Sequence, residues 1–323
     1  MHKQDVLFVL TIDTEEEWQW DEEFPQHNCS VENVEKLPAF QTFCESLCIR
    51  PTYFVDYAVA SNNLGSQTLR TFAKSNSAEI GAHLHPWCNP PYFGKTTEAE
   101  SHVINLPLEQ VEQKLDALNA LLHDEIGVRP QSFRSGRWGV SAKMLRLLAS
   151  RGYVVDSSVY PFYRNDYFSC LGAPESPYWP SFDNALAPGE QRQLLEVPVT
   201  AGFNIQNFSL GERIHNRLSK PPFNWVKSVG LLWHSKLLRK IYLSPELTEI
   251  EDMLARHEDF RQGPQVFARG MCLRVAPVDE DPEQDARDVR VDDRRPLPER
   301  EAPNRPCRIR AYALAREQCF LVR

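Results

Sequence analysis

The sequence lacks an apolar run long enough to span a bilayer, which takes about 20 residues. Its first apolar run, VLFVLTI, is short, and it ends in carboxylates where a signal peptide would have small residues before its cleavage site. We therefore interpret residues 6–12 as a buried strand. The lack of an export signal predicts a cytoplasmic protein with no membrane span.

Negative charge exceeds positive charge in this chain. Its 323 residues include 36 Lys and Arg against 44 Asp and Glu, a formal net charge of −8. This balance gives no electrostatic reason to expect nucleic acid or an anionic membrane surface as a partner.

Eight cysteines are present without paired spacing. Free thiols in a reducing compartment are the simplest interpretation.

What the sequence does contain is a repeated alternation of short apolar runs with amphipathic segments. Helical spacing of apolar residues is clear over residues 34–47 and 108–122. Such alternation predicts an α/β fold with helices outside a parallel sheet, either open or closed into a barrel. Six runs have the composition expected of its strands: residues 6–12, 53–55, 78–85, 131–134, 153–156 and 194–200.

Three segments depart from this alternation. Residues 160–193 are rich in Pro, Tyr, Trp and Asn, which predicts a long excursion at one end of the scaffold. Residues 203–242 carry aromatic and basic side chains, which either bind a polymer or form a surface helix pair with its aromatics packed inward. We expect the main domain to cover residues 1–255. Residues 256–323 contain no lysine and few large apolar side chains, so we expect an atypical, largely disordered tail. An altered reading frame and a natural charged tail both account for it.

Carboxylates follow the first predicted strand directly, in the run TIDTEEE. At the carboxyl end of a parallel strand, polar groups from neighbouring loops converge on one mouth. Because clustered carboxylates repel one another, a cation between Asp13 and Glu15 would stabilise both. The alternative is a solvated acidic turn, which we prefer for Glu16 and Glu17.

A histidine pair ends another predicted strand, in the run HLHPW. Alternation along an extended chain points His83 and His85 to the same side, and Pro86 favours that extended conformation. Two imidazoles on one face supply half of a zinc site, and a carboxylate completes the set typical of hydrolytic zinc, with one position left for water. Satisfied core histidines are the alternative.

Two further strand ends are polar. In FRSGRWG, Arg134 can form a bidentate pair with a carboxylate, and Gly136 and Gly139 would let backbone N–H groups approach a developing oxyanion. A glycine turn with a surface arginine is the alternative. Asp156, in VVDSS, either faces the same mouth or caps a helix.

Taken in order, these four stretches resemble the motifs of the polysaccharide deacetylases of the NodB-homology class, carbohydrate esterase family 4, over about residues 5–255. The resemblance is closest to a subgroup whose first motif is Asp-x-Glu or Asp-x-Asp. It implies a distorted (β/α)7-type barrel whose catalytic domain covers residues 1–255. Asp13 matches the general base of the family. Glu15, His83 and His85 match the ligands of a divalent metal, with Zn²⁺ the expected ion.

The same resemblance implies a hydrolase that removes an N-acetyl or similar acyl group from a carbohydrate. Arg134 would orient the base, and Asp156 would complete the catalytic set. We expect Trp87, Gly136 and Trp138 to contact the N-acetylated sugar. No nucleic acid partner is expected, and the sequence makes no prediction of an oligomeric state.

The sequence departs from the family pattern in two places. The common spacing puts the second histidine four residues after the first, where this chain has Trp87, so His85 takes that role. The family also closes its site with a general-acid histidine after the last strand, and no histidine follows His257. His234, in Trp-His-Ser, lies earlier and in a helical context. The alternatives are therefore an impaired or inactive carbohydrate-binding relative, and an unrelated barrel with core histidines.

Overall fold

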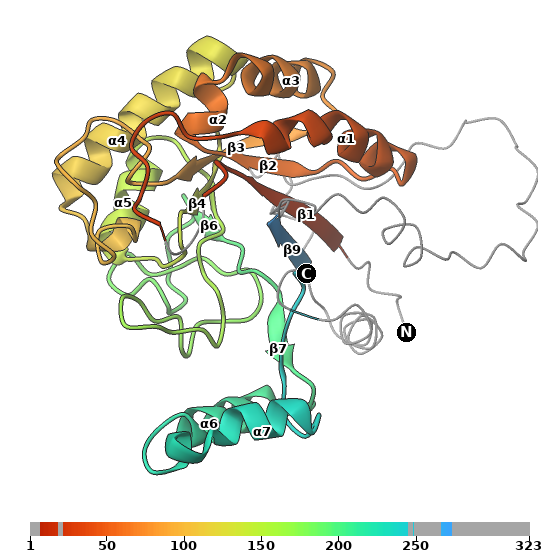
Figure 1. The fold of residues 1–323 in the computed structure, drawn as a ribbon, viewed down its shortest axis with the longest axis vertical. Helices are drawn as coiled ribbons and strands as arrows, with labels where there is room; N and C mark the ends of the chain where they lie inside the picture. The colour runs from red at the N-terminus through yellow and green to blue at the C-terminus, as the bar shows by residue number, and fades with distance from the viewer. Residues whose placement is uncertain (1–6, 19–21, 245–247, 249–265, 273–323) are drawn as a thin grey trace, which may run out of the picture.

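The architecture is one parallel sheet with helices on its outside, seen in a computed structural model that describes residues 7–18, 22–244, 248 and 266–272 (Figure 1). The sheet has seven strands in the order β6-β5-β4-β3-β2-β1-β9, and each neighbouring pair is parallel. The expected α/β fold is confirmed. The strands are β1 (Leu7–Thr14), β2 (Thr52–Val55), β3 (Glu79–Leu84), β4 (Ser132–Ser135), β5 (Val155–Asp156), β6 (Leu195–Glu196) and β9 (Val266–Cys272).

The sheet curls into part of a barrel, which confirms the expected distorted barrel. Among the described residues its end strands, β6 and β9, do not pair, so the barrel is open there. Strand β9 pairs with β1 over its whole length, and the sheet therefore extends beyond residue 255. The rest of the predicted tail over 256–323 lies outside the described residues.

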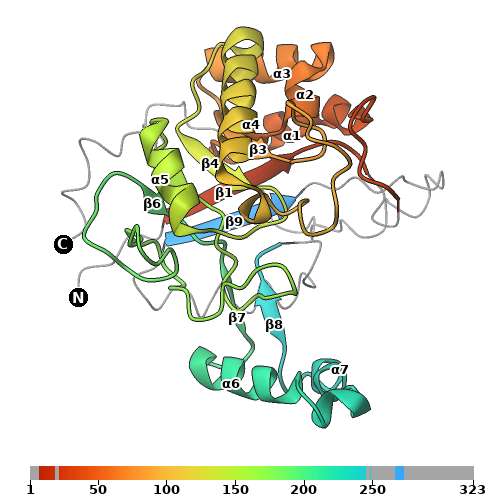
Figure 2. The same ribbon diagram turned by 90° about the vertical axis from the view of Figure 1, so that its left-hand side faces the viewer.

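Among the described residues, the helices α1 to α5 cover the outside of the curled sheet (Figures 1 and 2). Strands β2 and β4 are buried at every residue, as expected of strands covered on both faces. None of the helices in the described part of the chain is long and apolar enough to cross a bilayer. The helices are α1 (Leu37–Ser46), α2 (Tyr57–Ser61), α3 (Asn63–Lys74), α4 (Leu108–Leu121) and α5 (Ala142–Ser150).

The stretch between β5 and β6, which includes the proposed excursion at residues 160–193, contains no helix and no named strand among its described residues. After β6 the chain leaves the sheet and builds what we call the outer lobe, residues 201–242. Two antiparallel strands join this lobe to the rest of the molecule (Figure 2). Its elements are β7 (Ala201–Phe203), α6 (Phe208–Leu218), η4 (Phe223–Val226), α7 (Ser228–His234) and β8 (Lys240–Tyr242).

The prediction that the lobe packs its aromatics inward is only partly right. Phe203 and Phe208 do pack, against Phe162 of the excursion. Trp225, however, is 77% exposed. Two short helices on a two-stranded hairpin bury one face only, so aromatics on the other face stay in contact with solvent.

A buried lysine fixes the loop that follows β3. Lys114, on α4, is 3% exposed, and its Nζ donates hydrogen bonds to the carbonyls of Pro86, Asn89 and Pro91 at 2.8, 2.5 and 2.8 Å. Burial lowers the pKa of Lys114 to about 8, so the ammonium is still the main form at neutral pH. The loop that it holds begins directly after His85, so Lys114 also helps to fix the end of β3.

We predict that Lys114→Met lowers the free energy of unfolding by roughly 3 kcal/mol, because three carbonyls, two of them buried, lose a charged donor. Urea unfolding at pH 7 measures the change. Lys143→Met, at an exposed position of α5, is the matched control and should shift stability by less than about 0.5 kcal/mol. Equal unfolding midpoints for the two variants would contradict this role for Lys114.

Candidate metal and catalytic site

Side chains at or just after the ends of β1, β3 and β4 meet at one edge of the sheet, in which β2 lies between β1 and β3. Asp13 lies at the end of β1, Glu15 directly after it, and Arg134 on β4, in register with His83 of β3. His85 follows β3 by one residue. The structure thus brings together five of the residues that the strand-end argument selected; the sixth, Asp156, lies on β5.

Both histidines present the same ring nitrogen to Glu15. The Nδ1 of His83 lies 2.9 Å from the carbonyl oxygen of Arg134, and because a carbonyl only accepts, this Nδ1 carries the proton. The Nδ1 of His85 lies 2.9 Å from the Glu16 carboxylate and donates in the same way. The two Nε2 atoms then lie 3.1 and 3.3 Å from Glu15 Oε2. Glu15, His83 and His85 each offer one ligand atom, all within 4.8 Å of one another.

The electrostatics of this trio depend on its carboxylates. Burial lowers the pKa of His85, but the nearby Glu16 and Glu15 outweigh it and raise that pKa well above the usual range. Burial also raises the pKa of Glu15, but His85 and His83 bring it well below the usual range. Without another cation, a proton on His85 supplies the positive charge between the two carboxylates.

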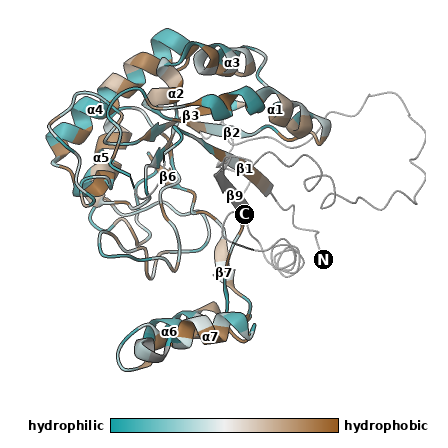
Figure 3. Ribbon diagram, in the orientation of Figure 1, coloured by the Kyte–Doolittle hydropathy of each residue, from teal (hydrophilic) through white to brown (hydrophobic). Residues whose placement is uncertain are grey.

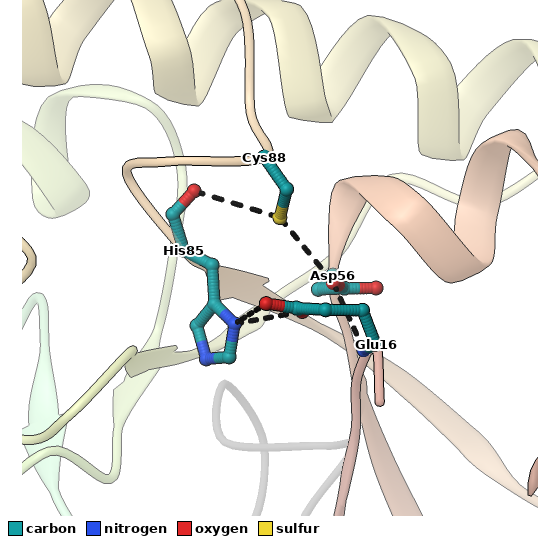
Figure 4. Close-up of side chains that lie close together, drawn as sticks. All are labelled: Glu16, Asp56, His85 and Cys88. Atoms are coloured by element: carbon teal, nitrogen blue, oxygen red, sulfur yellow. Dashed lines mark hydrogen bonds and ion pairs between the residues drawn. The ribbon is translucent and has the colours of Figure 1, made fainter. Parts of the chain in front are cut away.

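Glu16 is buried, so our preference for a solvated turn at this residue was wrong. Its carboxylate accepts from His85 and, at 2.5 Å, from the indole Nε1 of Trp87. Its backbone N–H donates to Asp56, the buried residue that also caps α2 (Figure 4). The carboxylate thus fixes the orientation of the His85 ring, as outer carboxylates do for metal-binding histidines. Glu17, by contrast, stays partly exposed and accepts from Ser30.

Trp87, expected at the substrate, is 1% exposed. Its ring centroid lies 4.3 Å from that of His85, and its N–H is committed to Glu16. This burial leaves the indole little surface for a sugar. The position instead makes Trp87 part of the packing that holds His85.

Asp13 and Arg134 form a buried ion pair, with Arg134 Nη1 donating to Asp13 Oδ1 at 2.5 Å. The other guanidinium nitrogens donate to Thr11 and Ser157. The guanidinium carbon lies 4.4 Å from the ring centroid of Phe54. Arg134 is therefore held on several sides and is not the surface arginine of the alternative interpretation.

The backbone N–H groups expected to face an oxyanion are already occupied. Gly136 N–H donates to the carbonyl of Leu84 at 3.1 Å, and Gly139 N–H donates to Ser158 at 3.2 Å. Gly136 matters for a different reason. A Cβ there would lie 2.3 Å from His85 Cδ2, so only glycine leaves room for the imidazole.

Trp138 is half-buried and has its ring centroid 5.1 Å from the Arg134 guanidinium carbon. It packs on Tyr160 of the excursion, with ring centroids 4.8 Å apart. Of the three residues expected at the substrate, only Trp138 both lies beside the Asp13 and Arg134 pair and keeps part of its side chain exposed to solvent.

His234, the weaker candidate for a general acid, lies at the end of α7 in the outer lobe.

Asp156 is buried beside an acid that the sequence did not single out. Glu196, on β6, is its register partner. Burial raises the pKa of Asp156 to about 6; burial and the Asp156 charge raise the pKa of Glu196 well above its usual range. Asp156 Oδ2 and Glu196 Oε2 receive no donor from the described side chains. A proton on Glu196, donated to the Asp156 carboxylate, removes one of these two buried charges.

Comparisons with known proteins support the fold. No family model matches the sequence, and no curated protein matches it. A crystal structure from Mycobacterium smegmatis, described as a polysaccharide deacetylase, aligns over 84% of this chain and 77% of its own, with 14% identity and a TM-score of 0.50. The chain thus has the polysaccharide-deacetylase fold that its motifs predicted.

Two further structures align less fully. One, described as a glycoside hydrolase/deacetylase from Parabacteroides distasonis, covers 60% of this chain and 44% of its own, with 18% identity and a TM-score of 0.43. A family 4 acetyl xylan esterase from Clostridium thermocellum, in complex with a cobalt ion, aligns over 48% of this chain and 58% of its own, with 17% identity and a TM-score of 0.31. At these identities the similarity concerns the fold alone.

We predict that stability falls as pH rises from 6 to 8 and that Glu196→Gln flattens this dependence. A carboxyl whose pKa is raised by folding binds more protons when folded, so its contribution is largest at low pH and declines towards the folded pKa. Glu196 contributes at most about 1.4 kcal/mol per pH unit to this decline. The amide introduced by Glu196→Gln keeps a donor to Asp156 without titrating.

Urea unfolding at pH 6, 7 and 8 measures this dependence. Glu190→Gln, at an exposed position shortly before β6, is the matched control and should keep the slope of the unaltered protein. If Glu196→Gln keeps that slope as well, Glu196 does not hold a proton in the folded state.

Proposed function

We propose that this chain is a metal-dependent hydrolase of the polysaccharide-deacetylase type, which removes an N-acetyl or similar acyl group from a carbohydrate in the cytoplasm. The observation that carries the proposal is the convergence of two histidine Nε2 atoms on one oxygen of Glu15, beside the buried pair of Asp13 and Arg134. The fold shared with the Mycobacterium smegmatis structure supports it.

The residues present suit a divalent cation. In their neutral form both histidines carry the proton on Nδ1, so both Nε2 lone pairs face the Glu15 carboxylate. Three acceptors in one place are unfavourable unless a cation lies between them. Two imidazoles and one carboxylate are also the set typical of catalytic zinc, and Zn²⁺ is the ion that we propose.

Such an ion, when bound, polarises the acyl carbonyl and lowers the pKa of water. The remaining roles belong to side chains of this chain. Arg134 holds Oδ1 of Asp13, which leaves Oδ2 to accept the proton of the attacking water. Glu16 and Trp87 hold the His85 ring in its orientation. Trp138 offers the sugar an aromatic face beside this site.

The first prediction from this proposal concerns the metal alone. The purified protein should bind one Zn²⁺ or Co²⁺, and Glu15→Gln should weaken that binding by roughly 10- to 100-fold, because a charged ligand becomes a neutral one. Calorimetric titration of each protein measures the affinity.

Glu17→Gln, two residues further along and partly exposed, is the control and should bind as the unaltered protein does. A protein that remains metal-free after dialysis against both ions would leave the histidines as core residues and remove the basis of the proposal.

The second prediction concerns the base. With Zn²⁺ or Co²⁺ present, Asp13→Asn should release acetate from N-acetylated oligosaccharides about 10²- to 10⁴-fold more slowly, because the amide accepts no proton. Asp183→Asn, whose carboxylate is exposed in a surface ion pair, is the control and should keep full activity.

Equal rates for Asp13→Asn and the unaltered protein would mean that Asp13 is not the base. If the unaltered protein binds the ion and the oligosaccharide but releases no acetate, the chain is instead an inactive carbohydrate-binding relative.

A further inference from the structure

The outer lobe concentrates the positive charge of a chain that is acidic as a whole. Residues 201–242 contain seven Lys and Arg against one acid, Glu212, a formal net charge of +6. The rest of the chain, with 29 basic and 43 acidic residues, carries −14. Five of the seven basic residues are exposed: Arg213, Arg217, Lys220, Lys227 and Lys236.

The same lobe concentrates exposed apolar side chains. It holds seven of the 12 large hydrophobic residues that are exposed among the described residues. Trp225, Leu231 and Leu237 are 77, 69 and 68% exposed, and the others are Leu210, Ile214, Phe223 and Trp233. A surface of this composition is uncommon on a protein that meets only water.

Cationic and apolar side chains are interleaved on this surface. On α6, Leu210 and Ile214 lie one turn apart, and Arg213 and Arg217 form the adjacent row. Figure 3 shows that hydrophobic and hydrophilic stretches alternate along α6 and α7. The opposite side of α6 packs inward, where Phe208 contacts Phe162. On the outward side, the Arg217 guanidinium carbon lies 5.3 Å from the ring centroid of Phe223 in η4. Leu210, Arg213 and Ile214 on that side remain exposed.

We propose that the outer lobe docks on the surface of an anionic lipid bilayer. Exposed lysines and arginines attract anionic headgroups, and Trp, Phe and Leu side chains enter the boundary between headgroups and acyl chains. Charge complementarity favours an anionic bilayer over a second copy of the chain. In a dimer formed through the lobes, two surfaces with a net charge of +6 each would face one another, and both lobes would have to bury that charge.

The lobe is joined directly to the candidate site. Tyr242, at the end of β8, packs on Tyr160 with ring centroids 4.5 Å apart, and Tyr160 packs on Trp138. Trp138 in turn lies against Arg134. Docking through the lobe would therefore hold the site near the headgroup layer. If the proposed hydrolase activity is correct, the substrate is a sugar carried by a lipid.

Co-sedimentation with vesicles tests the docking without substrate or metal, so its outcome is independent of the hydrolase proposal. The protein should bind vesicles of equal parts phosphatidylglycerol and phosphatidylcholine roughly tenfold or more tightly than pure phosphatidylcholine vesicles, and about 0.5 M NaCl should weaken that binding. Arg213→Gln with Arg217→Gln should weaken it roughly 10- to 30-fold.

Trp225→Ser with Leu231→Ser should weaken binding to the same vesicles at low salt, because the inserted side chains are lost. Lys74→Gln with Lys143→Gln, exposed cations on the helices around the sheet, is the matched control and should bind normally. Unchanged thermal unfolding of each variant shows that it folds. No preference for anionic vesicles, equal binding by all variants, or a dimer that only the lobe variants disrupt would each overturn the proposal.

Discussion

The buried guanidinium of Arg134 is the group on which the rest of the site depends. A charge removed from water costs several kcal/mol unless it is paired and hydrogen-bonded. Here Asp13 supplies the opposite charge, while Thr11 and Ser157 accept the remaining donors. The backbone carbonyl of the same residue accepts from His83 and so sets the tautomer of that histidine. One residue of β4 thus orients the proposed base through its side chain and a proposed metal ligand through its backbone.

A second set of contacts orients the other histidine. Glu16 accepts from Nδ1 of His85, Trp87 donates to Glu16, and Asp56 accepts the backbone N–H of Glu16. These contacts join the ends of β1, β2 and β3 at the point where Lys114 fixes the following loop. His83 is thus held by a carbonyl and His85 by a carboxylate. Because a carboxylate makes the histidine that it accepts from more basic, His85 is the more basic of the two imidazoles.

The strand-end rule explains how much of the site could be predicted from the sequence. It places polar residues at the carboxyl ends of parallel strands on one edge, and this was enough to bring Asp13, His83 and Arg134 together. The same rule applied to the strand at residues 53–55 would have selected Asp56. Glu16 was missed because its burial depends on Trp87, which is 71 residues away in sequence. The N–H of Gly136 cannot donate to an oxyanion because it donates to the carbonyl of Leu84 in the neighbouring strand. That contact could not be predicted from the residues around Gly136 in the sequence. The charge of the outer lobe went unnoticed for another reason: net charge averages over the chain, so a total of −8 conceals the +6 of the lobe.

The three acids around Arg134 show how the charges in this core are balanced. One guanidinium cannot neutralise Asp13, Asp156 and Glu196 together, and burial makes each uncompensated carboxylate costly. Asp13 takes the direct contact. Asp156 and Glu196 lie further away, and their raised pKa values follow from burial that Arg134 only partly offsets. A proton shared between them removes one negative charge, so the net charge of the four groups falls from −2 to −1, with Asp13 as the carboxylate paired to the arginine.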